Sequence, residues 1–236
     1  MMERTYDDLF IDFDDTLCDT HAGAQQSLYD LFEEFGLGRW FDSADDFIVP
    51  YWQANIDLWQ SYGKGEVTRE YLILERFRRP LSHGHGLTVT DEQCLRMSDR
   101  FLDFCVENTG PLDGAHELVD YLRQRGYRLH LCSNGFHEVQ FRKLRNCGMD
   151  GCFDSVILSE DAGVNKPRRG FFDYAFRVSQ AKPETTVMIG DGWDSDMRGA
   201  IDYGLDTIFF NRFPDYPAPE PVTYEVHRLE DIRGIL

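Results

Sequence analysis

The stretch Leu9-Phe10-Ile11-Asp12-Phe13-Asp14-Asp15-Thr16 indicates both the fold class and the chemistry of this chain. A short apolar run, typical of a strand buried on both faces, ends directly at two carboxylates, Asp12 and Asp14. Two like charges about 4 Å apart repel by roughly 4 kcal/mol at an effective dielectric near 20. We therefore expect a cation between them, or a proton on one of them. A divalent metal beside a carboxylate nucleophile favours phosphoryl chemistry.

Two other interpretations of this acidic pair are a calcium loop and a helix N-cap. An EF-hand calcium loop starting at Asp12 would require glycine at its sixth position and glutamate at its twelfth, but Leu17 and Gly23 stand there. A helix N-cap would not explain why two acids follow so apolar a strand. Catalysis is therefore the preferred interpretation, and Asp15 is given no role.

The composition limits the possible partners. The 236 residues include 42 acidic and 24 basic side chains, which gives a formal net charge of −18. This charge argues against nucleic acid or an anionic membrane as a partner, and it requires an anionic substrate to be attracted locally. No apolar run approaches the roughly 18 residues of a membrane helix, and the polar start of the chain, 1–8, does not resemble a signal peptide. A cytoplasmic protein is predicted, with a small phosphorylated metabolite as its partner. The six cysteines form no CxxC pair and are predicted to be free, buried thiols.

From about Asp113 the pattern alternates between strand and helix, which predicts an α/β fold with a doubly wound parallel sheet. Helices are expected at 113–125, up to Cys147, at 171–179 and up to Gly204; strands are expected at 127–132, 156–158, 187–189 and 207–210. The proline-rich tail at 214–221 is expected to run over the surface.

The segment between about 18 and 108 has helical periodicity and no convincing strand. Its apolar stripes include Leu28 with Leu31 and Tyr51 with Leu58, and Thr90 to Gln93 fits a capping box before a further stripe. We therefore predict a core domain of residues 1–18 and 110–236, interrupted by a helical domain of residues 19–109.

Polar residues follow several of the predicted strands. Because ligands bind at the carboxyl ends of parallel strands, these residues are expected to converge on one crevice. Asp12, Asp14 and Asp191 are candidate metal ligands. Asp196 is expected to lie behind these ligands and not to bind the metal directly. Ser133 and Asn134 could bind phosphate through a hydroxyl and N–H groups, and Lys166 could supply the fixed cation that a phosphate needs. His83 and His85 alternate with glycines in a loop between helices, so a metal site is not expected there.

These residues together resemble the haloacid dehalogenase superfamily of phosphatases. The resemblance spans four motifs in order, namely Asp12-x-Asp14-x-Thr16, Ser133, Lys166-Pro167 and Gly190-Asp191-x4-Asp196. It implies a Rossmann-like core with an inserted helical cap of the first cap class. It also implies Mg²⁺, an aspartyl-phosphate on Asp12, Asp14 as the proton shuttle, and Thr16 among the phosphate-binding residues.

The inserted segment adds a narrower resemblance, to the pyrimidine 5′-nucleotidases of this superfamily. It rests on Leu58-Trp59-x-x-Tyr62-x-Lys64-Gly65-Glu66-Val67-Thr68, Arg76-Phe77, Ser133-Asn134-Gly135-Phe136 and Gly163-Val164-Asn165-Lys166-Pro167. The implied function is a nucleotidase for pyrimidine nucleoside 5′-monophosphates. The alternatives are a phosphatase or mutase for sugar phosphates or phosphoglycolate, a 2-haloacid dehalogenase, which Asp14 disfavours, and an inactive binding protein. The residues suggested for substrate selection are Tyr51, Trp52, Asn55 and Trp59.

Overall fold

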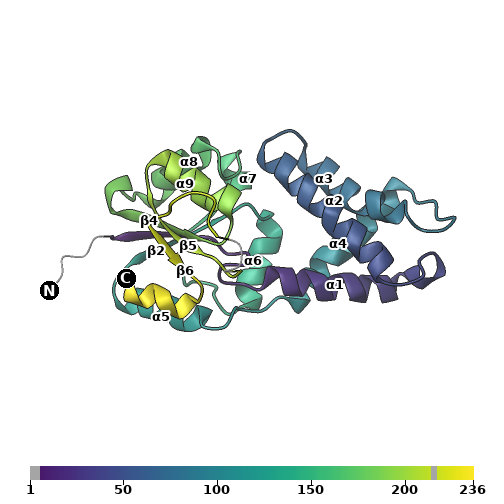
Figure 1. Ribbon diagram of the computed structural model, residues 1–236, viewed down its shortest axis with the longest axis horizontal. Helices are drawn as coiled ribbons and strands as arrows, with labels where there is room; N and C mark the ends of the chain where they lie inside the picture. The colour runs from purple at the N-terminus through teal and green to yellow at the C-terminus, as the bar shows by residue number, and fades with distance from the viewer. Residues whose placement is uncertain (1–5, 214–216) are drawn as a thin grey trace. The chain divides into compact units, whose positions relative to one another are not determined.

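The computed structural model describes residues 6–213 and 217–236. The chain forms two compact units, one made of Met1–Asp19 with Gly110–Leu236 and the other of Thr20–Thr109. Each unit is described by itself, the first as the α/β unit and the second as the helical unit (Figure 1).

The α/β unit is built on a six-stranded sheet with the order β3-β2-β1-β4-β5-β6, in which every pair is parallel. Its strands are β1 (Asp8–Ile11), β2 (Arg128–Ser133), β3 (Ser155–Leu158), β4 (Thr186–Gly190), β5 (Asp206–Phe210) and β6 (Tyr224–Val226). The apolar run before Asp12 becomes β1, which lies in the middle of the sheet between β2 and β4. The doubly wound parallel sheet predicted from the sequence is confirmed.

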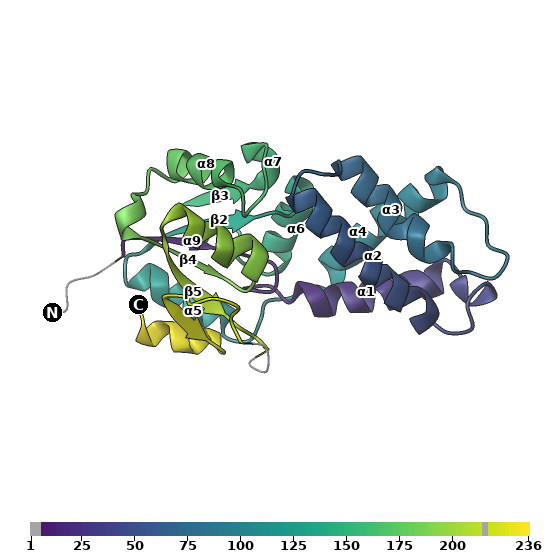
Figure 2. The same ribbon diagram turned by 45° about the horizontal axis from the view of Figure 1, so that its top comes forward.

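Helices cover both faces of this sheet (Figure 2), which explains why its strands are continuously apolar. Side chains alternate along β1, so Leu9 and Ile11 share one core with α5 (Ala115–Gln124) and α6 (His137–Asn146). The ring of Phe10 points to the opposite face, where α8 (Arg169–Ser179) and α9 (Arg198–Tyr203) pack. Burial of β1 on both sides fixes the position of Asp12 at its carboxyl end.

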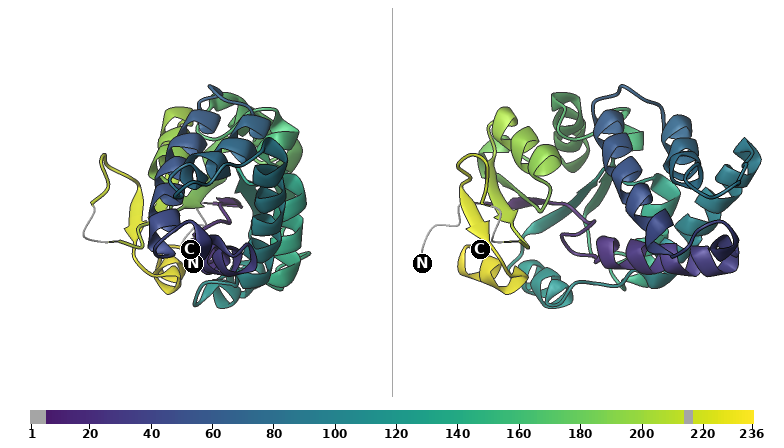
Figure 3. Two further views of the ribbon diagram at one scale, coloured as in Figure 1. Left: turned by 90° about the vertical axis from the view of Figure 1, so that its right-hand side faces the viewer. Right: turned by 45° about the vertical axis from the view of Figure 1, so that its right-hand side comes forward.

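The helical unit contains α1 (Thr20–Glu34), α2 (Asp45–Gly63), α3 (Arg69–Leu81) and α4 (Asp91–Asn108), with the 3₁₀ turn η1 (Leu37–Arg39) after α1. Helix α1 packs against α4, and α3 packs against both α2 and α4. The expected capping box is present, because Gln93 N–H donates to Thr90 Oγ1 and Thr90 N–H donates to the Gln93 side chain. Figure 3 shows these helices from two further directions. An inserted α-helical domain is therefore part of the fold.

One prediction of local structure needs correction, and one strand was missed. The helix expected before Gly204 begins as a π-helical turn, η3 (Trp193–Met197), and only then continues as α9. Strand β6 was not predicted, because three residues after a proline-rich stretch carry too little pattern. The remaining short helical elements are α7 (Ser159–Ala162), η2 (Pro183–Thr185) and η4 (Leu229–Gly234).

Other predictions can be compared with the described residues. The six cysteines, all among the described residues, form no disulfide; five are buried and Cys152 is half-buried. The part of the proline-rich tail at 217–221 is mostly exposed, as expected, while 214–216, like residues 1–5 of the polar N-terminus, lie outside the described residues. Within the described chain, none of the helices has the length and apolar character to cross a bilayer.

Candidate active site

The candidate site lies at the carboxyl ends of the three central strands of the α/β unit. Asp12 directly follows β1, Ser133 is the last residue of β2, and Asp191 directly follows β4. Because β1 is hydrogen-bonded to both β2 and β4 in parallel register, these three strand ends are neighbours. Sequence positions more than a hundred residues apart are thus brought to one edge of the sheet.

Lys166 reaches the same edge from the loop between α7 and α8 and is almost completely enclosed, with its side chain 1% exposed. Its Nζ lies 2.6 Å from Asp12 Oδ1, 2.6 Å from Asp196 Oδ1 and 2.6 Å from the carbonyl oxygen of Cys132. An ammonium group has three donors, and here all three are used. The lysine is therefore a fixed cation between two buried carboxylates.

Asn134 holds the backbone of this lysine. Its side-chain Nδ2 donates to the carbonyl oxygen of Lys166 at 3.0 Å, and its Oδ1 accepts from the N–H of Lys166 at 2.9 Å. The amide side chain of Asn134 is thus used to place the Lys166 loop, so any phosphate contact from this residue would come from its backbone N–H.

Thr16 ties the loop after β1 to the loop after β4. Its hydroxyl donates to Asp191 Oδ1 at 2.9 Å and accepts from the N–H of Asp191 at 3.0 Å. The first and fourth motifs are joined through this side chain.

The protonation behaviour of the site follows from burial and charge. Burial raises the pKa of Asp12 well above its usual value, with Asp196, Asp191 and Asp14 adding to the effect and the Lys166 ammonium opposing it. Burial also raises the pKa of Asp191 to about 8, helped by the charges of Asp196 and Asp15. Burial alone would lower the pKa of Lys166, but the two carboxylates beside it raise its pKa. The site therefore has more carboxyl groups than its lysine can neutralise, and without a metal these groups tend to keep protons.

The carboxylates of Asp12, Asp191 and Asp196 each offer an oxygen within 4.8 Å of the others, and Asp12 and Asp196 are buried. Three oxygen donors so arranged are the chemistry that Mg²⁺ prefers. Asp196 is the least available of the three, because Oδ1 accepts from Lys166 and Oδ2 accepts from the N–H of Gly192 at 3.0 Å. A side chain at Gly190 would not fit beside Asp196, because a Cβ there would lie 2.5 Å from Asp196 Oδ2.

Asp14 lies in the same region and has partners that the sequence analysis missed. Lys143 Nζ pairs with Asp14 Oδ1, and Gln140 Nε2 donates to Asp14 Oδ2 and, at 2.6 Å, to Ser133 Oγ. The only signal in the sequence was the Gln-x-x-Lys spacing on the helix that follows Ser133, a pattern common on solvated helix faces.

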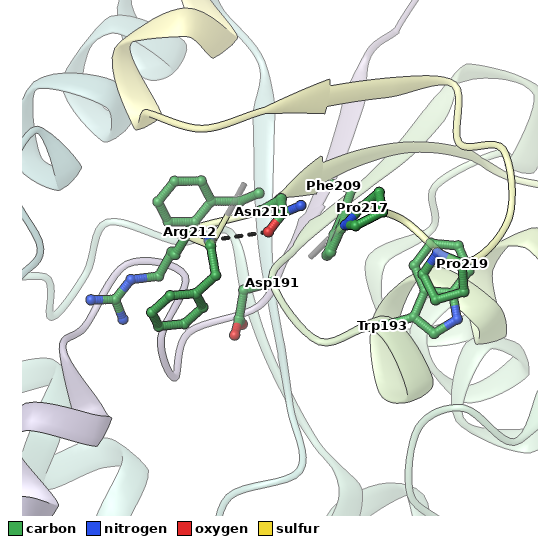
Figure 4. A pocket seen from close by; sticks show the side chains of 9 residues that line it. Asp191, Trp193, Phe209, Asn211, Arg212, Pro217 and Pro219 are labelled. Atoms are coloured by element: carbon green, nitrogen blue, oxygen red, sulfur yellow. Dashed lines mark hydrogen bonds between the residues drawn. The ribbon is translucent and has the colours of Figure 1, made fainter. Parts of the chain in front are cut away.

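Asp15, which had no role in the sequence analysis, has a structural one. Its φ is 61°, and Arg212, after β5, donates to it at 3.1 Å and to Asp19 at 3.2 Å. Arg212 and Asp191 also line a cavity of about 280 Å³, together with Trp193, Phe209, Phe210, Asn211, Phe213, Pro217 and Pro219 (Figure 4). This cavity shares Asp191 with the acidic site and is lined mainly by aromatic and proline side chains.

The residues suggested for substrate selection lie in the helical unit. Tyr51 is 1% exposed and packs against Phe77 and Phe101, so this suggestion was wrong and Tyr51 serves the core of that unit. Trp52, Asn55 and Trp59 are half-buried.

The loop expected to contain His83 and His85 is a set of turns between α3 and α4. No metal-binding cluster other than Asp12, Asp191 and Asp196 is found among residues 6–213 and 217–236.

Residues 7–204 match the family model of the haloacid dehalogenase-like hydrolases. The chain belongs to this hydrolase family. It is 32% identical to the HAD-hydrolase YfnB of Bacillus subtilis over 235 residues, which cover 99% of this chain and 96% of YfnB. The crystal structure of YfnB bound to magnesium has a TM-score of 0.86 to this structure at 30% identity and covers 98% of both chains.

Two further relatives have names that state an activity. The chain is 30% identical over 234 residues to the pyrimidine 5′-nucleotidase YjjG of Escherichia coli, covering 96% of this chain and 97% of YjjG. It is 29% identical over 234 residues to the pyrimidine 5′-nucleotidase PynA of Streptococcus pneumoniae, covering 98% of this chain and 95% of PynA. The family resemblance predicted from the four motifs is confirmed.

Proposed function

We propose that this enzyme is a magnesium-dependent phosphomonoester hydrolase that acts through an aspartyl-phosphate on Asp12. The observation that carries the proposal is the cluster of Asp12, Asp191 and Asp196, in which the enclosed ammonium of Lys166 pairs with Asp12 and Asp196. Such a cluster favours binding of a divalent cation, and a cation beside a carboxylate favours attack on a phosphorylated substrate.

Mg²⁺ held by Asp12, Asp191 and the backbone carbonyl of Asp14 would offset the negative charge of the carboxylate and the phosphate. Asp12 is the nucleophile, and its orientation is fixed by the bond from Lys166 to Oδ1. The phosphoryl oxygens would be held by Ser133 and the Asn134 N–H, which lie at the end of β2. Lys166 and Thr16 would join them by exchanging one of their present bonds, to Asp12 or Asp196 and to Asp191 respectively, for a phosphoryl oxygen.

The reaction takes place in two halves. In the first, a carboxylate oxygen of Asp12 attacks phosphorus, the bond from phosphorus to the ester oxygen breaks, and Asp14 transfers its proton to that oxygen. In the second, Asp14 takes a proton from water, the water oxygen attacks phosphorus, and inorganic phosphate leaves while the carboxylate of Asp12 is regenerated. Asp196 stays outside the chemistry and holds Lys166.

The proposed substrates are pyrimidine nucleoside 5′-monophosphates. This part rests on the near full-length similarity to YjjG and PynA, both named pyrimidine 5′-nucleotidases. The helical unit is proposed to act as the cap that excludes bulk water and selects the substrate.

A phosphate-release screen with Mg²⁺ tests the proposal. Pyrimidine and purine nucleoside monophosphates, sugar phosphates, phosphoglycolate and p-nitrophenyl phosphate are compared at equal concentration. The highest kcat/KM is expected for the pyrimidine nucleotides. Release from sugar phosphates alone would reject the substrate assignment, formation of an isomer without phosphate would indicate a mutase, and no release from any ester would reject the hydrolase.

A further inference from the structure

The carboxylate of Asp14 is held by two side chains of α6, and the proposed mechanism assigns no role to either. Lys143 Nζ contacts Asp14 Oδ1, while Gln140 Nε2 donates to Asp14 Oδ2. The two residues are three apart on the helix, so they share one face of it. The side chain of Lys143 is only 5% exposed. A lysine buried this deeply needs an acceptor, and Asp14 provides one.

Gln140 also connects Asp14 with Ser133. The same Nε2 donates to Ser133 Oγ at 2.6 Å, and this hydroxyl also accepts from the N–H of Gly135 at 2.9 Å. The approach of the amide depends on the glycine, because a Cβ at Gly135 would lie 2.0 Å from Gln140 Nε2. The Ser-Asn-Gly sequence at the end of β2 therefore leaves space for a side chain from the next helix.

We propose that Gln140 and Lys143 are positioning residues that hold Asp14 and Ser133 for proton transfer and phosphate binding. This inference rests on the proposed hydrolase function. A carboxylate at the end of a loop can rotate, whereas one with a donor on each oxygen has a fixed plane. Proton transfer requires hydrogen-bond reach and alignment, so rotation of Asp14 would slow both halves of the reaction. Neither residue is assigned a contact with the reacting phosphoryl group.

The experiment uses leaving groups that differ in their need for a proton. p-Nitrophenolate leaves readily without one, whereas the alkoxide of a nucleoside or an alkyl phosphate needs protonation. We expect Lys143→Met and Gln140→Met to lower kcat for the alkyl ester by about 10- to 100-fold, with KM changed less than about threefold, as part of the 10²- to 10⁴-fold available from acid–base catalysis. With p-nitrophenyl phosphate, phosphorylation of Asp12 should continue while hydrolysis of the aspartyl-phosphate slows. The variants should therefore release a rapid burst of p-nitrophenolate, approaching one per active site.

Two controls accompany these variants. Arg145→Met removes a cation from the exposed side of the same helix and should leave kcat for both esters unchanged. Lys143→Arg keeps the charge and should restore a large part of kcat on the alkyl ester. If Lys143→Met does not fold, Gln140→Met alone tests the positioning role, through kcat for the alkyl ester and the burst of p-nitrophenolate.

The possible outcomes are distinguishable. Equal losses on both esters with a raised KM would assign the two side chains to phosphate binding and overturn the inference, as would unchanged kcat on both. An inactive wild-type protein with Mg²⁺ would instead overturn the hydrolase proposal, and the inference with it.

Discussion

Lys166→Met in the metal-free protein is the most direct test of the electrostatics of this site. The lysine is enclosed by Asp12, Asp196 and a carbonyl oxygen, each 2.6 Å from Nζ. Methionine has similar length and no charge. The substitution therefore leaves two buried carboxylates without their cation while filling most of the same volume.

Three contributions set the loss in the free energy of unfolding that Lys166→Met should cause. At 2.6 Å and an effective dielectric near 20, each charge pair attracts by about 6 kcal/mol. Part of this is offset because the wild-type lysine has been taken out of water, which costs several kcal/mol. In the variant, protonation of a carboxylate limits the loss, since keeping a proton from an ordinary pKa near 4 up to pH 7 costs about 4 kcal/mol. We therefore expect the free energy of unfolding to fall by about 3–5 kcal/mol, the range found when one partner of a buried pair is removed.

The assay is urea unfolding at pH 7 in EDTA, arranged as a double-mutant cycle with Asp196→Asn. Removing the lysine and one of its carboxylates together should cost less than the sum of the single changes, with a coupling of about 2 kcal/mol. Lys182→Met, at an exposed lysine of the same unit, is the matched control and should change stability by less than about 0.5 kcal/mol. A cost below about 1 kcal/mol for Lys166→Met, or additivity within about 0.5 kcal/mol, would refute the reasoning.

Three further predictions address the nucleophile, the metal and the protonation of the site. Asp12→Asn should abolish phosphate release while circular dichroism remains unchanged, and turnover above a thousandth of wild type would contradict Asp12 as nucleophile. EDTA should remove activity and Mg²⁺ should restore it, because Lys166 alone cannot offset the three neighbouring carboxylates; activity insensitive to the chelator would contradict the metal site. Because burial raises the folded-state pKa of Asp191 to about 8, the folded protein holds a proton that the unfolded chain has lost. The free energy of unfolding of the metal-free protein should therefore fall as the pH rises from 5 to 8, and Asp191→Asn should make this fall smaller. An unchanged slope in that variant would show that other groups set the pH dependence.

Much of this protein could be predicted from local pattern alone. The apolar run before Asp12, the alternation after Asp113 and the glycines after α5, α6 and α9 report local conformation, because burial and backbone geometry restrict which residues can stand there. The polar residues at the carboxyl ends of the strands identified the edge of the sheet where the chemistry lies. These features were sufficient to predict the fold class and the family.

The contacts that tune the site were decided only by the tertiary structure. A lysine or glutamine on an amphipathic helix, such as Lys143 or Gln140, has the same pattern in sequence whether it faces water or a half-buried carboxylate such as that of Asp14. Likewise, the pairing of Asp15 with Arg212 joins segments about two hundred residues apart, and no local signal encodes it. The sequence determined which charges the chain carries and where its strands end. The packing of α6 and of the Lys166 loop against those strand ends determined which charges meet, because that depends on the distance between side chains and on their exclusion from water.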